Sequence, residues 1–267
     1  MKVLKLGIIG AGFVGGAVSK GFDRDVEQFI VDPKLNNNTV KDLVAFDAPL
    51  TFACLPTPPT PDGGVDSSLL DDVLSKLAEQ KYKGLVVIKS TITPYYLLKF
   101  KKNYNLKLVY NPEFLTEANA DQDFINSKML VLGGKWRDCE FVEKCYARHS
   151  SVKLTPAFKT DLITASLVKY TINSFLATKV AFFNELYDLF QESNAHSSWE
   201  HFTQILAADP RMGTSHMQVP GPDGSRGFGG HCFPKDTEAF SMYAHLLGPK
   251  LSILDKAIAS NKKIRKN

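Results

Sequence analysis

The sequence predicts an α/β protein in two parts, an N-terminal doubly wound parallel sheet followed by an all-helical domain. In the first half, short runs of β-branched and apolar residues alternate with helical patterns, which is typical of strand and helix units joined by right-handed crossovers. After about residue 151 the strand-like runs end, and apolar residues repeat at helical spacing. We therefore expect a sheet domain at residues 1–155 and a helical domain at 156–267.

Six strands are expected in the first domain, at residues 3–9, 28–31, 50–55, 85–90, 106–110 and 128–132, with helices at 67–80 and 95–102. Residues 161–192 contain neither Pro nor Gly and repeat apolar side chains at helical spacing, so we expect one long helix there, straight or kinked. Further helices are expected at 197–208, 237–247 and 251–263. A loop rich in Gly and Pro at 210–234 separates the first two of these.

Composition excludes several classes of protein. No apolar stretch of the 267 residues approaches the length of about 20 that a membrane span needs. The N-terminus carries no pattern of a cleavable signal, so we expect a cytoplasmic protein without a membrane partner. The four cysteines are spaced like neither a disulfide framework nor a zinc site, so thiols and no metal are expected. The net charge of +4 is small, and the basic end at 262–266 is interpreted as a solvated helix end rather than a nucleic-acid contact.

A glycine motif near the N-terminus predicts a dinucleotide site. Gly10, Gly12 and Gly15 follow the first expected strand and open a helix through Phe13 and Val14, and Asp32 ends the next strand. Such glycines let backbone N–H groups approach a pyrophosphate, and the acid can bind the adenosine ribose, as in a Rossmann-like domain. A carboxylate there repels a 2′-phosphate, which favours NAD over NADP. A glycine turn used only for packing would not explain Asp32.

The most specific segment is Gly-Phe-Gly-Gly-His-Cys-Phe-Pro-Lys-Asp at residues 227–236. Its glycines allow close approach of a ligand to the backbone. The Cys232 thiol, with Lys235 and Asp236 nearby, can be tuned toward a nucleophilic thiolate. The alternative is a structural cysteine buried in a glycine-rich loop.

Taken in order, several further motifs complete a resemblance to one family. They are Cys54-Leu55-Pro56-Thr57-Pro58, Lys89-Ser90-Thr91-Ile92, Asn111-Pro112-Glu113-Phe114-Leu115-Thr116-Glu117, Lys169 with Asn173, Phe182-Phe183-Asn184-Glu185 and Asp209-Pro210-Arg211-Met212-Gly213. Together with the glycine motif and the cysteine loop, they make the chain similar to the UDP-glucose and GDP-mannose dehydrogenase family. The resemblance implies oxidation of the primary alcohol of a nucleotide sugar, with a UDP-sugar favoured, to a carboxylate in two hydride transfers that use two NAD and one water.

The resemblance also implies a role for individual residues. Cys232 would trap the intermediate aldehyde as a thiohemiacetal and carry the later thioester, while Lys169 and Asn173, one helical turn apart, would stabilise oxyanions. Asp236, Thr91 and Glu113 would position or activate the water. Further contacts follow by the same resemblance: Pro56, Thr57, Thr91 and Glu117 on the cofactor side, and Phe114, Leu115, Lys169, Asn173, Arg211 and Gly229 on the substrate side. Arg211 would reach across to a partner subunit, or it is an ordinary surface arginine.

The sequence departs from the family in two respects that bear on function. Family members continue into a second α/β domain that holds most of the nucleotide, whereas this sequence ends at Asn267, so its remaining contacts would address mainly the sugar. A short insertion, Asp223-Gly224-Ser225-Arg226, precedes the cysteine loop.

Two other functions remain open. One is a β-hydroxyacid type of dehydrogenase, which transfers a single hydride and needs a lysine but no cysteine. The other is a truncated, catalytically weak homologue that only binds NAD. A homodimer through the helical domain is expected from the apolar Phe175, Phe182 and Phe183 of the long helix, unless these pack against the cofactor domain of the same chain.

Overall fold

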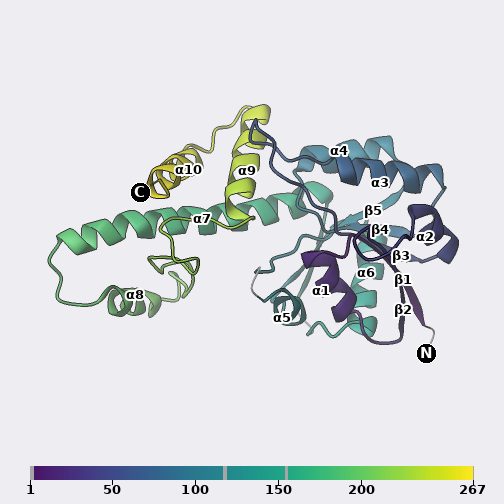
Figure 1. Ribbon diagram of the computed structural model, residues 1–267, viewed down its shortest axis with the longest axis horizontal. Coiled ribbons are helices and arrows are strands. Elements are labelled where there is room, and N and C mark those ends of the chain that lie inside the picture. Colours follow the sequence, from purple (N-terminus) through teal and green to yellow (C-terminus); the bar gives the residue numbers. More distant parts are fainter. Residues whose placement is uncertain (1–2, 117–118, 154–155, 267) are drawn as a thin grey trace. The chain divides into compact units, whose positions relative to one another are not determined.

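The computed structural model describes residues 3–116, 119–153 and 156–266, and the chain separates into two compact units (Figure 1). Unit 1 comprises Met1–Pro58 and Val65–Lys169, and unit 2 comprises Pro59–Gly64 and Tyr170–Asn267. One long helix, α7 (Leu162–Glu192), gives its first residues to unit 1 and the others to unit 2.

Unit 1 is built on a sheet to which the described residues contribute seven strands in the order β2-β1-β3-β4-β5-β6-β7. The strands are β1 (Leu4–Ile9), β2 (Val26–Val31), β3 (Leu50–Ala53), β4 (Leu85–Ile88), β5 (Lys107–Tyr110), β6 (Leu130–Gly134) and β7 (Ala157–Thr160). The first five are parallel. Chain order reverses between β1 and β3, and the carboxyl ends of strands at such a switch point are where doubly wound sheets bind ligands.

Helices cover both faces of this sheet. They are α1 (Phe13–Gly21), α2 (Val40–Phe46), α3 (Ser68–Glu79), α4 (Pro94–Asn103), α5 (Ala120–Ile125) and α6 (Trp136–His149). Alternate strand residues point to opposite faces. Leu6 and Phe52 pack with α1, α5 and α6 in one apolar core, while Ala53 and Val86 pack with α2, α3 and α4 in the other (Figure 1). The predicted fold class, a doubly wound sheet covered by helices on both faces, is thus confirmed, and the glycine turn lies between β1 and α1.

The prediction was wrong about the far edge of the sheet. β6 runs antiparallel to β5, with Val109 opposite Gly134, and β7, which the sequence analysis did not predict, pairs parallel with β6. β6 therefore begins at the edge of the sheet where β5 ends, and the described part of the connection contains the six-residue helix α5. β7 was missed because its four residues carry an exposed Phe158 instead of an apolar run.

Unit 2 is helical and contains, besides most of α7, the helices α8 (Trp199–Ala207), α9 (Phe233–Leu247) and α10 (Ser252–Ile264). The single long helix predicted from the Pro-free stretch is confirmed. One small core joins Phe228 to Ala177, Ala181 and Ala257, and another surrounds Trp199 with Phe183, Met217 and Val219. In the described residues, no helix combines the length and the apolar composition that crossing a bilayer requires.

The start of α9 differs from the prediction in a way that affects the site. The helix begins at Phe233, one turn before the predicted start at residue 237, with Pro234 in its first turn. Proline is tolerated there because the N–H it lacks would have no partner within the helix. The residue that precedes the helix is therefore Cys232.

Candidate active site

The glycine turn between β1 and α1 contains two glycines that the fold itself requires. Gly10 has φ +82°, and a Cβ there would lie 2.6 Å from the carbonyl oxygen of Cys54. A Cβ on Gly15 would lie 1.8 Å from the carbonyl oxygen of Gly10. At Gly12, immediately before α1, a Cβ would meet nothing within 4 Å in the described part of the chain. The turn therefore leaves open space at the helix N-terminus, where backbone N–H groups bind a phosphate.

Asp32 lies just beyond the end of β2, beside this turn. Its carboxylate accepts hydrogen bonds from the backbone N–H of Ala11 at 2.6 Å and of Lys34 at 2.8 Å. These two bonds lower the pKa of Asp32, so the group is a carboxylate at neutral pH. The remaining lone pairs can accept hydrogen bonds from ribose hydroxyls, whereas the negative charge would repel a phosphate at the same place.

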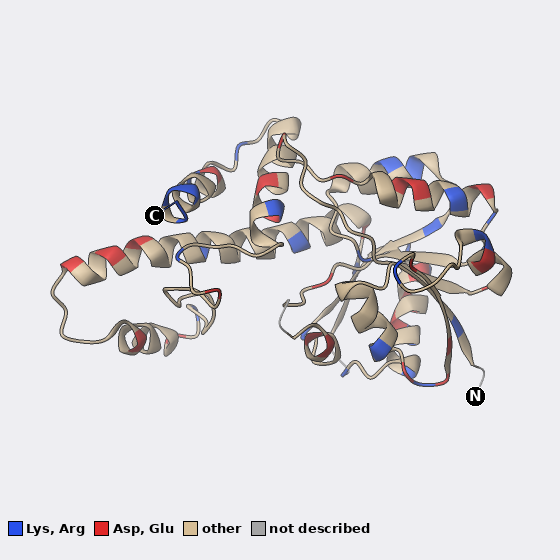
Figure 2. Ribbon diagram, viewed as in Figure 1, with Lys and Arg blue, Asp and Glu red and all other residues tan. Residues whose placement is uncertain are grey.

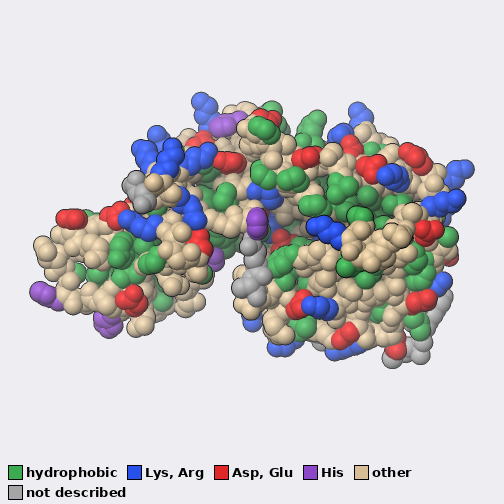
Figure 3. Space-filling model, in the orientation of Figure 1, with side chains coloured by type: hydrophobic (Ala, Val, Ile, Leu, Met, Phe, Trp, Pro, Cys, Tyr) green, Lys and Arg blue, Asp and Glu red, His purple; other side chains and the backbone are tan. Residues whose placement is uncertain are grey.

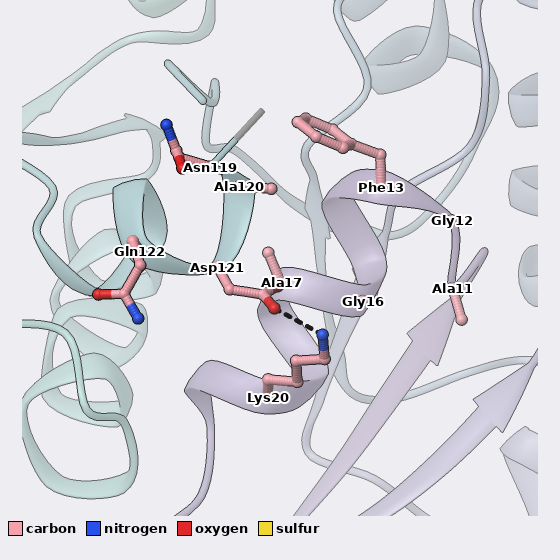
Figure 4. Close-up of a pocket in the computed structure, with 10 residues that line it drawn as sticks. All are labelled: Ala11, Gly12, Phe13, Gly16, Ala17, Lys20, Asn119, Ala120, Asp121 and Gln122. Atoms are coloured by element: carbon pink, nitrogen blue, oxygen red, sulfur yellow. Dashed lines mark hydrogen bonds and ion pairs between the residues drawn. The ribbon is translucent and has the colours of Figure 1, made fainter. Parts of the chain in front are cut away.

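An open pocket of about 620 Å³ lies against the same turn (Figure 4). Its lining comes from the glycine turn and α1, including Gly12 and the 42% exposed Phe13, and from the start of α5. Val14 is half-buried in the first turn of α1. The ion pair between Lys20 of α1 and Asp121 of α5, at 2.5 Å, joins the two helices that form the pocket. Together with Gly12 and Asp32, this pocket fits a dinucleotide.

Hydrogen bonds tie together the segments that follow β3 and β4. The hydroxyl of Thr57 is buried and donates to the carbonyl oxygen of Thr91 at 2.8 Å, while Pro56 is exposed. The hydroxyl of Ser90 donates to the carbonyl oxygen of Leu55 and accepts from its N–H. The residues predicted to contact the cofactor after these two strands are thus held as one layer at the carboxyl edge of the sheet.

Lys169 and Glu113 form a buried ion pair in unit 1. The Lys169 Nζ lies 2.5 Å from the carbonyl oxygen of Glu113, 3.0 Å from its Oε1 and 5.3 Å from the ring centroid of Phe114. The N–H of Leu115 donates to Oε2 at 2.7 Å. Burial alone would raise the pKa of Glu113, but the charge of Lys169 and these hydrogen bonds hold that pKa below its usual value. The structure therefore brings together four predicted residues, Glu113, Phe114, Leu115 and Lys169.

A second buried lysine lies at the end of β4. The Lys89 Nζ donates to Asn111 Oδ1 at 3.0 Å, and the hydroxyl of Tyr146 donates to the same oxygen at 2.7 Å. Burial lowers the pKa of Lys89 to about 8. The sequence analysis included this lysine in a motif but gave it no role. A cation directly after the fully apolar strand at 85–88 was the signal that could have singled it out.

Three of the four cysteines are poor candidates for a nucleophile. Burial raises the pKa of Cys54 to about 12, of Cys139 to about 11 and of Cys145 to about 12, so all three are neutral thiols at physiological pH. Cys232 is only half-buried and occupies the position that caps α9. Its carbonyl oxygen accepts the N–H of Asp236 at 2.8 Å. The positive end of a helix favours a thiolate.

Asp236 is buried in the first turn of α9 between two donors. The Lys235 Nζ lies 2.6 Å from its Oδ1, and the Asn173 side-chain amide of α7 donates to Oδ2 at 2.6 Å. The side chain of Asp236 is only 1% exposed. Unit 2 therefore joins two predicted residues, Asn173 and Asp236, and adds Lys235 to them.

The other predicted residues are placed as follows. The side chain of Arg211 is 88% exposed, and its guanidinium binds both carboxylate oxygens of Asp209, with Nε 2.9 Å from Oδ1 and Nη2 2.5 Å from Oδ2. Gly229 lies half-buried in the loop before Cys232. Glu117 lies outside the described residues.

Comparison with known proteins identifies the family. Residues 18–150 match the profile of the UDP-glucose/GDP-mannose dehydrogenase family, NAD binding domain, and residues 163–263 match that of the central domain of the same family. The chain belongs to this family. Its residues 18–150 are the family's NAD-binding domain, which agrees with the open glycine turn and the carboxylate of Asp32.

Individual members of the family are similar along most of the chain. A UDP-glucose 6-dehydrogenase of Rickettsia conorii is 32% identical over 247 residues, which cover 90% of this chain and 55% of the relative. A solved UDP-glucose dehydrogenase from the archaeon Pyrobaculum islandicum superimposes with a TM-score of 0.84 at 25% identity, covering 98% of this chain and 68% of that one. The chain spans about half the length of the curated relatives it matches.

The fold is also shared outside the dehydrogenases of nucleotide sugars. A 3-hydroxyisobutyrate dehydrogenase of Mycobacterium tuberculosis superimposes with a TM-score of 0.73 at 14% identity, covering 99% of this chain and 94% of that one. At this identity the likeness concerns the fold alone. The family assignment therefore rests on the sequence matches.

Proposed function

We propose that this chain carries the cofactor-binding and chemical parts of an NAD-dependent nucleotide-sugar dehydrogenase. It would oxidise the primary alcohol of a sugar nucleotide, a UDP-sugar by preference, to the carboxylate. The observation that carries the proposal is the position of Cys232 at the N-terminus of α9, where the next turn holds Asp236 between Lys235 and Asn173. A cysteine kept only for packing needs neither a helix N-terminus nor such a set of charges.

The overall reaction needs an electron acceptor, and NAD would accept one hydride from the carbinol carbon in each oxidation while the hydroxyl proton passes to water. After the first oxidation, the Cys232 sulfur adds to the aldehyde carbon, and the thiol proton ends on the new hydroxyl. Loss of the second hydride from the same carbon, with the hydroxyl proton, gives a thioester. Water then adds to the thioester carbon, the C–S bond breaks, and the carboxylate and the thiol are released.

The other proposed residues act on charge and on protons in these steps. Lys169 and Asn173, four residues apart on α7, would stabilise the oxyanions that form at the carbonyl oxygen. Glu113, Asp236 and Thr91 would position or activate the water. Glu117 would contact the nicotinamide ribose. Two buried pairs support these roles, Lys169 with Glu113 and Asn173 with Asp236. Each pair places a hydrogen-bond donor, which can stabilise an oxyanion, beside a carboxylate, which can accept a proton from water.

The substrate contacts remain part of the same proposal. Phe114 and Leu115 would hold the sugar through the segment that Glu113 orders, and Gly229 through the backbone of the cysteine loop. Arg211 would reach a substrate bound to a partner subunit, and the 88% exposure of its side chain is compatible with that role.

A homodimer through α7 is proposed from the surface of this helix. Phe175, Phe182 and Leu189 are spaced by seven residues and are 66%, 57% and 64% exposed. A repeat of seven residues places apolar side chains in one seam, as in paired helices. Phe183, expected to belong to this surface, instead packs against Trp199 within unit 2.

The test is the stoichiometry of NADH formation. The protein is incubated with NAD and a panel of UDP- and GDP-sugars, and two NADH per sugar are expected, with no uronate from Cys232→Ala. One NADH per substrate, unaffected by the loss of the thiol, would instead favour the single-hydride mechanism of β-hydroxyacid dehydrogenases. If NAD raises the melting temperature but no nucleotide sugar yields NADH, the chain is an NAD-binding homologue without turnover.

A further inference from the structure

The loop that carries Cys232 is fixed to α10 by the side-chain amide of Asn261, which forms the two hydrogen bonds that a neighbouring strand would form. The side-chain amide of Asn261 accepts the N–H of Phe228 at 2.7 Å and donates to the carbonyl oxygen of Phe228 at 2.9 Å. Asn261 is 6% exposed, and the ring of Phe228 is buried against Ala177 and Ala257. Both polar backbone groups of the residue four positions before Cys232 are therefore satisfied by one buried amide.

Arg265, which immediately follows α10, contacts the loop on both sides of Phe228. Its Nη1 lies 3.3 Å from the carbonyl oxygens of Arg226 and Gly227. A Cβ on Gly229 would lie 2.6 Å from its Nη2, so the guanidinium rests directly on the glycine backbone. The side chain of Arg265 is 31% exposed, so this residue of the exposed basic segment also contacts the loop.

The short insertion ahead of the loop completes this arrangement. Asp223 accepts from the Arg265 Nη2 at 2.8 Å, and the turn around it closes through a bond from the N–H of Gly221 to the carbonyl oxygen of Ser225. On the other side, Arg226 donates to the carbonyl oxygen of Asn184 on α7 at 2.8 Å and pairs with Asp188. The charged residues of the insertion thus tie the loop to α10 and to α7.

We propose that Asn261 and Arg265 are positioning residues, which hold the loop at 226–230 so that Cys232 stays at the N-terminus of α9, and that the insertion contributes Asp223 to this clamp. The proposal rests on the proposed role of Cys232 as nucleophile. Gly229 is part of this clamp because any side chain at residue 229 would displace the guanidinium of Arg265.

The physical consequence concerns the reactivity of the thiol. A cysteine held at the positive end of a helix reacts faster because its thiolate is stabilised. If the clamp is released, the thiol leaves that position and its reaction with iodoacetamide slows. If the loop merely shielded the thiol, release would expose it and the reaction would accelerate. The direction of the change therefore separates the two roles.

The test measures alkylation of Cys232 by iodoacetamide at pH 7 in the full chain, by peptide mass mapping. Asn261→Leu and Arg265→Met are each expected to slow the reaction about tenfold, and Gly229→Ala to resemble Arg265→Met. Lys263→Met, which removes an exposed cation of the same helix, is the matched control and should leave the rate unchanged. The conservative variant Arg265→Lys should be alkylated nearly as slowly as Arg265→Met, because one ammonium cannot make the several contacts of the planar guanidinium.

Amide hydrogen exchange shows whether a variant has lost its fold or only the hydrogen bonds of the loop. Peptides from 226–232 should exchange at least tenfold faster in Asn261→Leu, while peptides of β1 and β3 keep their protection. An unchanged or faster alkylation in a folded variant would overturn the proposal. Because alkylation needs neither NAD nor substrate, a slower reaction in a protein that makes no NADH would support the clamp and contradict the proposed function instead.

Discussion

The ammonium of Lys169 contacts Glu113 twice, at its backbone carbonyl oxygen and at its carboxylate. Both side chains are almost fully buried, at 2% and 7% exposure. Removing one member of such a pair leaves an uncompensated charge in the interior, which costs about 3–5 kcal/mol. Lys169→Met and Glu113→Gln are each expected to lower the free energy of urea unfolding by about that amount.

Two further results would identify the pair as the cause. The double variant should lose clearly less than the sum of the single variants. The contribution of Glu113 to the free energy of unfolding should also depend on pH. Its pKa in the folded protein lies below the unfolded value of about 4.5, so the pair stabilises above that pH and its contribution is lost as pH falls through the folded pKa. Strict additivity at pH 7 would contradict this account.

Lys89 is expected to cost stability rather than provide it. Burial lowers its pKa from 10.5 to about 8, with Cys54 and Glu113 opposing the shift and Lys169 adding to it. Between these two values the unfolded chain binds a proton that the folded chain does not, so for this group stability rises with pH over that window. Lys89→Met should therefore be more stable than the wild type at pH 7, by about 1–3 kcal/mol after the loss of the hydrogen bonds to Asn111.

The measurement is urea unfolding of both proteins at pH 7 and pH 9.5. The advantage of Lys89→Met should shrink at the higher pH, and Lys263→Met, at an exposed site, should show no such trend. A variant less stable than the wild type at both values would mean that the bonds to Asn111 outweigh the cost of burial. Turnover by Lys89→Met should fall, because Lys89 holds the segment that leads to Glu113.

Asp32 is expected to decide between NAD and NADP. Asp32→Asn keeps the size of the side chain but removes the charge and part of the capacity to accept ribose hydroxyls. Calorimetric titration should show NAD binding weakened by about tenfold and NADP binding improved relative to NAD. Asp72→Asn, at an exposed helical site, is the matched control. If Asp32→Asn bound both cofactors as the wild type does, Asp32 would not contact the cofactor.

The seam on α7 predicts the oligomeric state. Phe182→Ser should shift the protein toward the monomer in light scattering after size exclusion, because it replaces the central apolar residue of the seam at residues 175, 182 and 189. Phe158→Ser is a fair control, since Phe158 is 55% exposed and lies on β7 of unit 1. The space-filling view shows apolar side chains on the surface of both units, so exposure alone does not single out the seam (Figure 3). Equal effects of both substitutions would contradict the assignment.

Local patterns were enough to predict the elements that the backbone period determines. The glycine turn, the first five strands and the long helix each follow from spacing within a few residues, and the structure confirms them. The direction of β6 could not be obtained in this way. It depends on how β6 pairs with β5 across the sheet, and no spacing within a few residues contains that pairing.

The partners of the charged residues were harder to predict than their positions. Lys169, Asn173 and Asp236 were selected through the family resemblance, but nothing in the sequence shows that Asn173 bonds Asp236 across 63 residues. Arg265 belongs to the basic segment at 262–266, which spacing alone assigns to solvent, and Figure 2 shows basic residues in blue at the C-terminal end of the chain. Its contact with Asp223 arises only when the insertion folds back on the helix.

The three glycines of the turn between β1 and α1 differ in what they are needed for: Gly10 and Gly15 are needed for folding, whereas Gly12 is not. Replacing Gly10 or Gly15 by alanine creates a clash inside the protein, so a screen based on stability would detect either change. An alanine Cβ at Gly12 would meet no atom within 4 Å among the described residues beyond its chain neighbours. A mutation there is therefore expected to leave the thermal stability unchanged and to weaken dinucleotide binding at the helix N-terminus. Inactive natural variants of this fold are therefore to be sought at the second glycine, among chains that are otherwise intact.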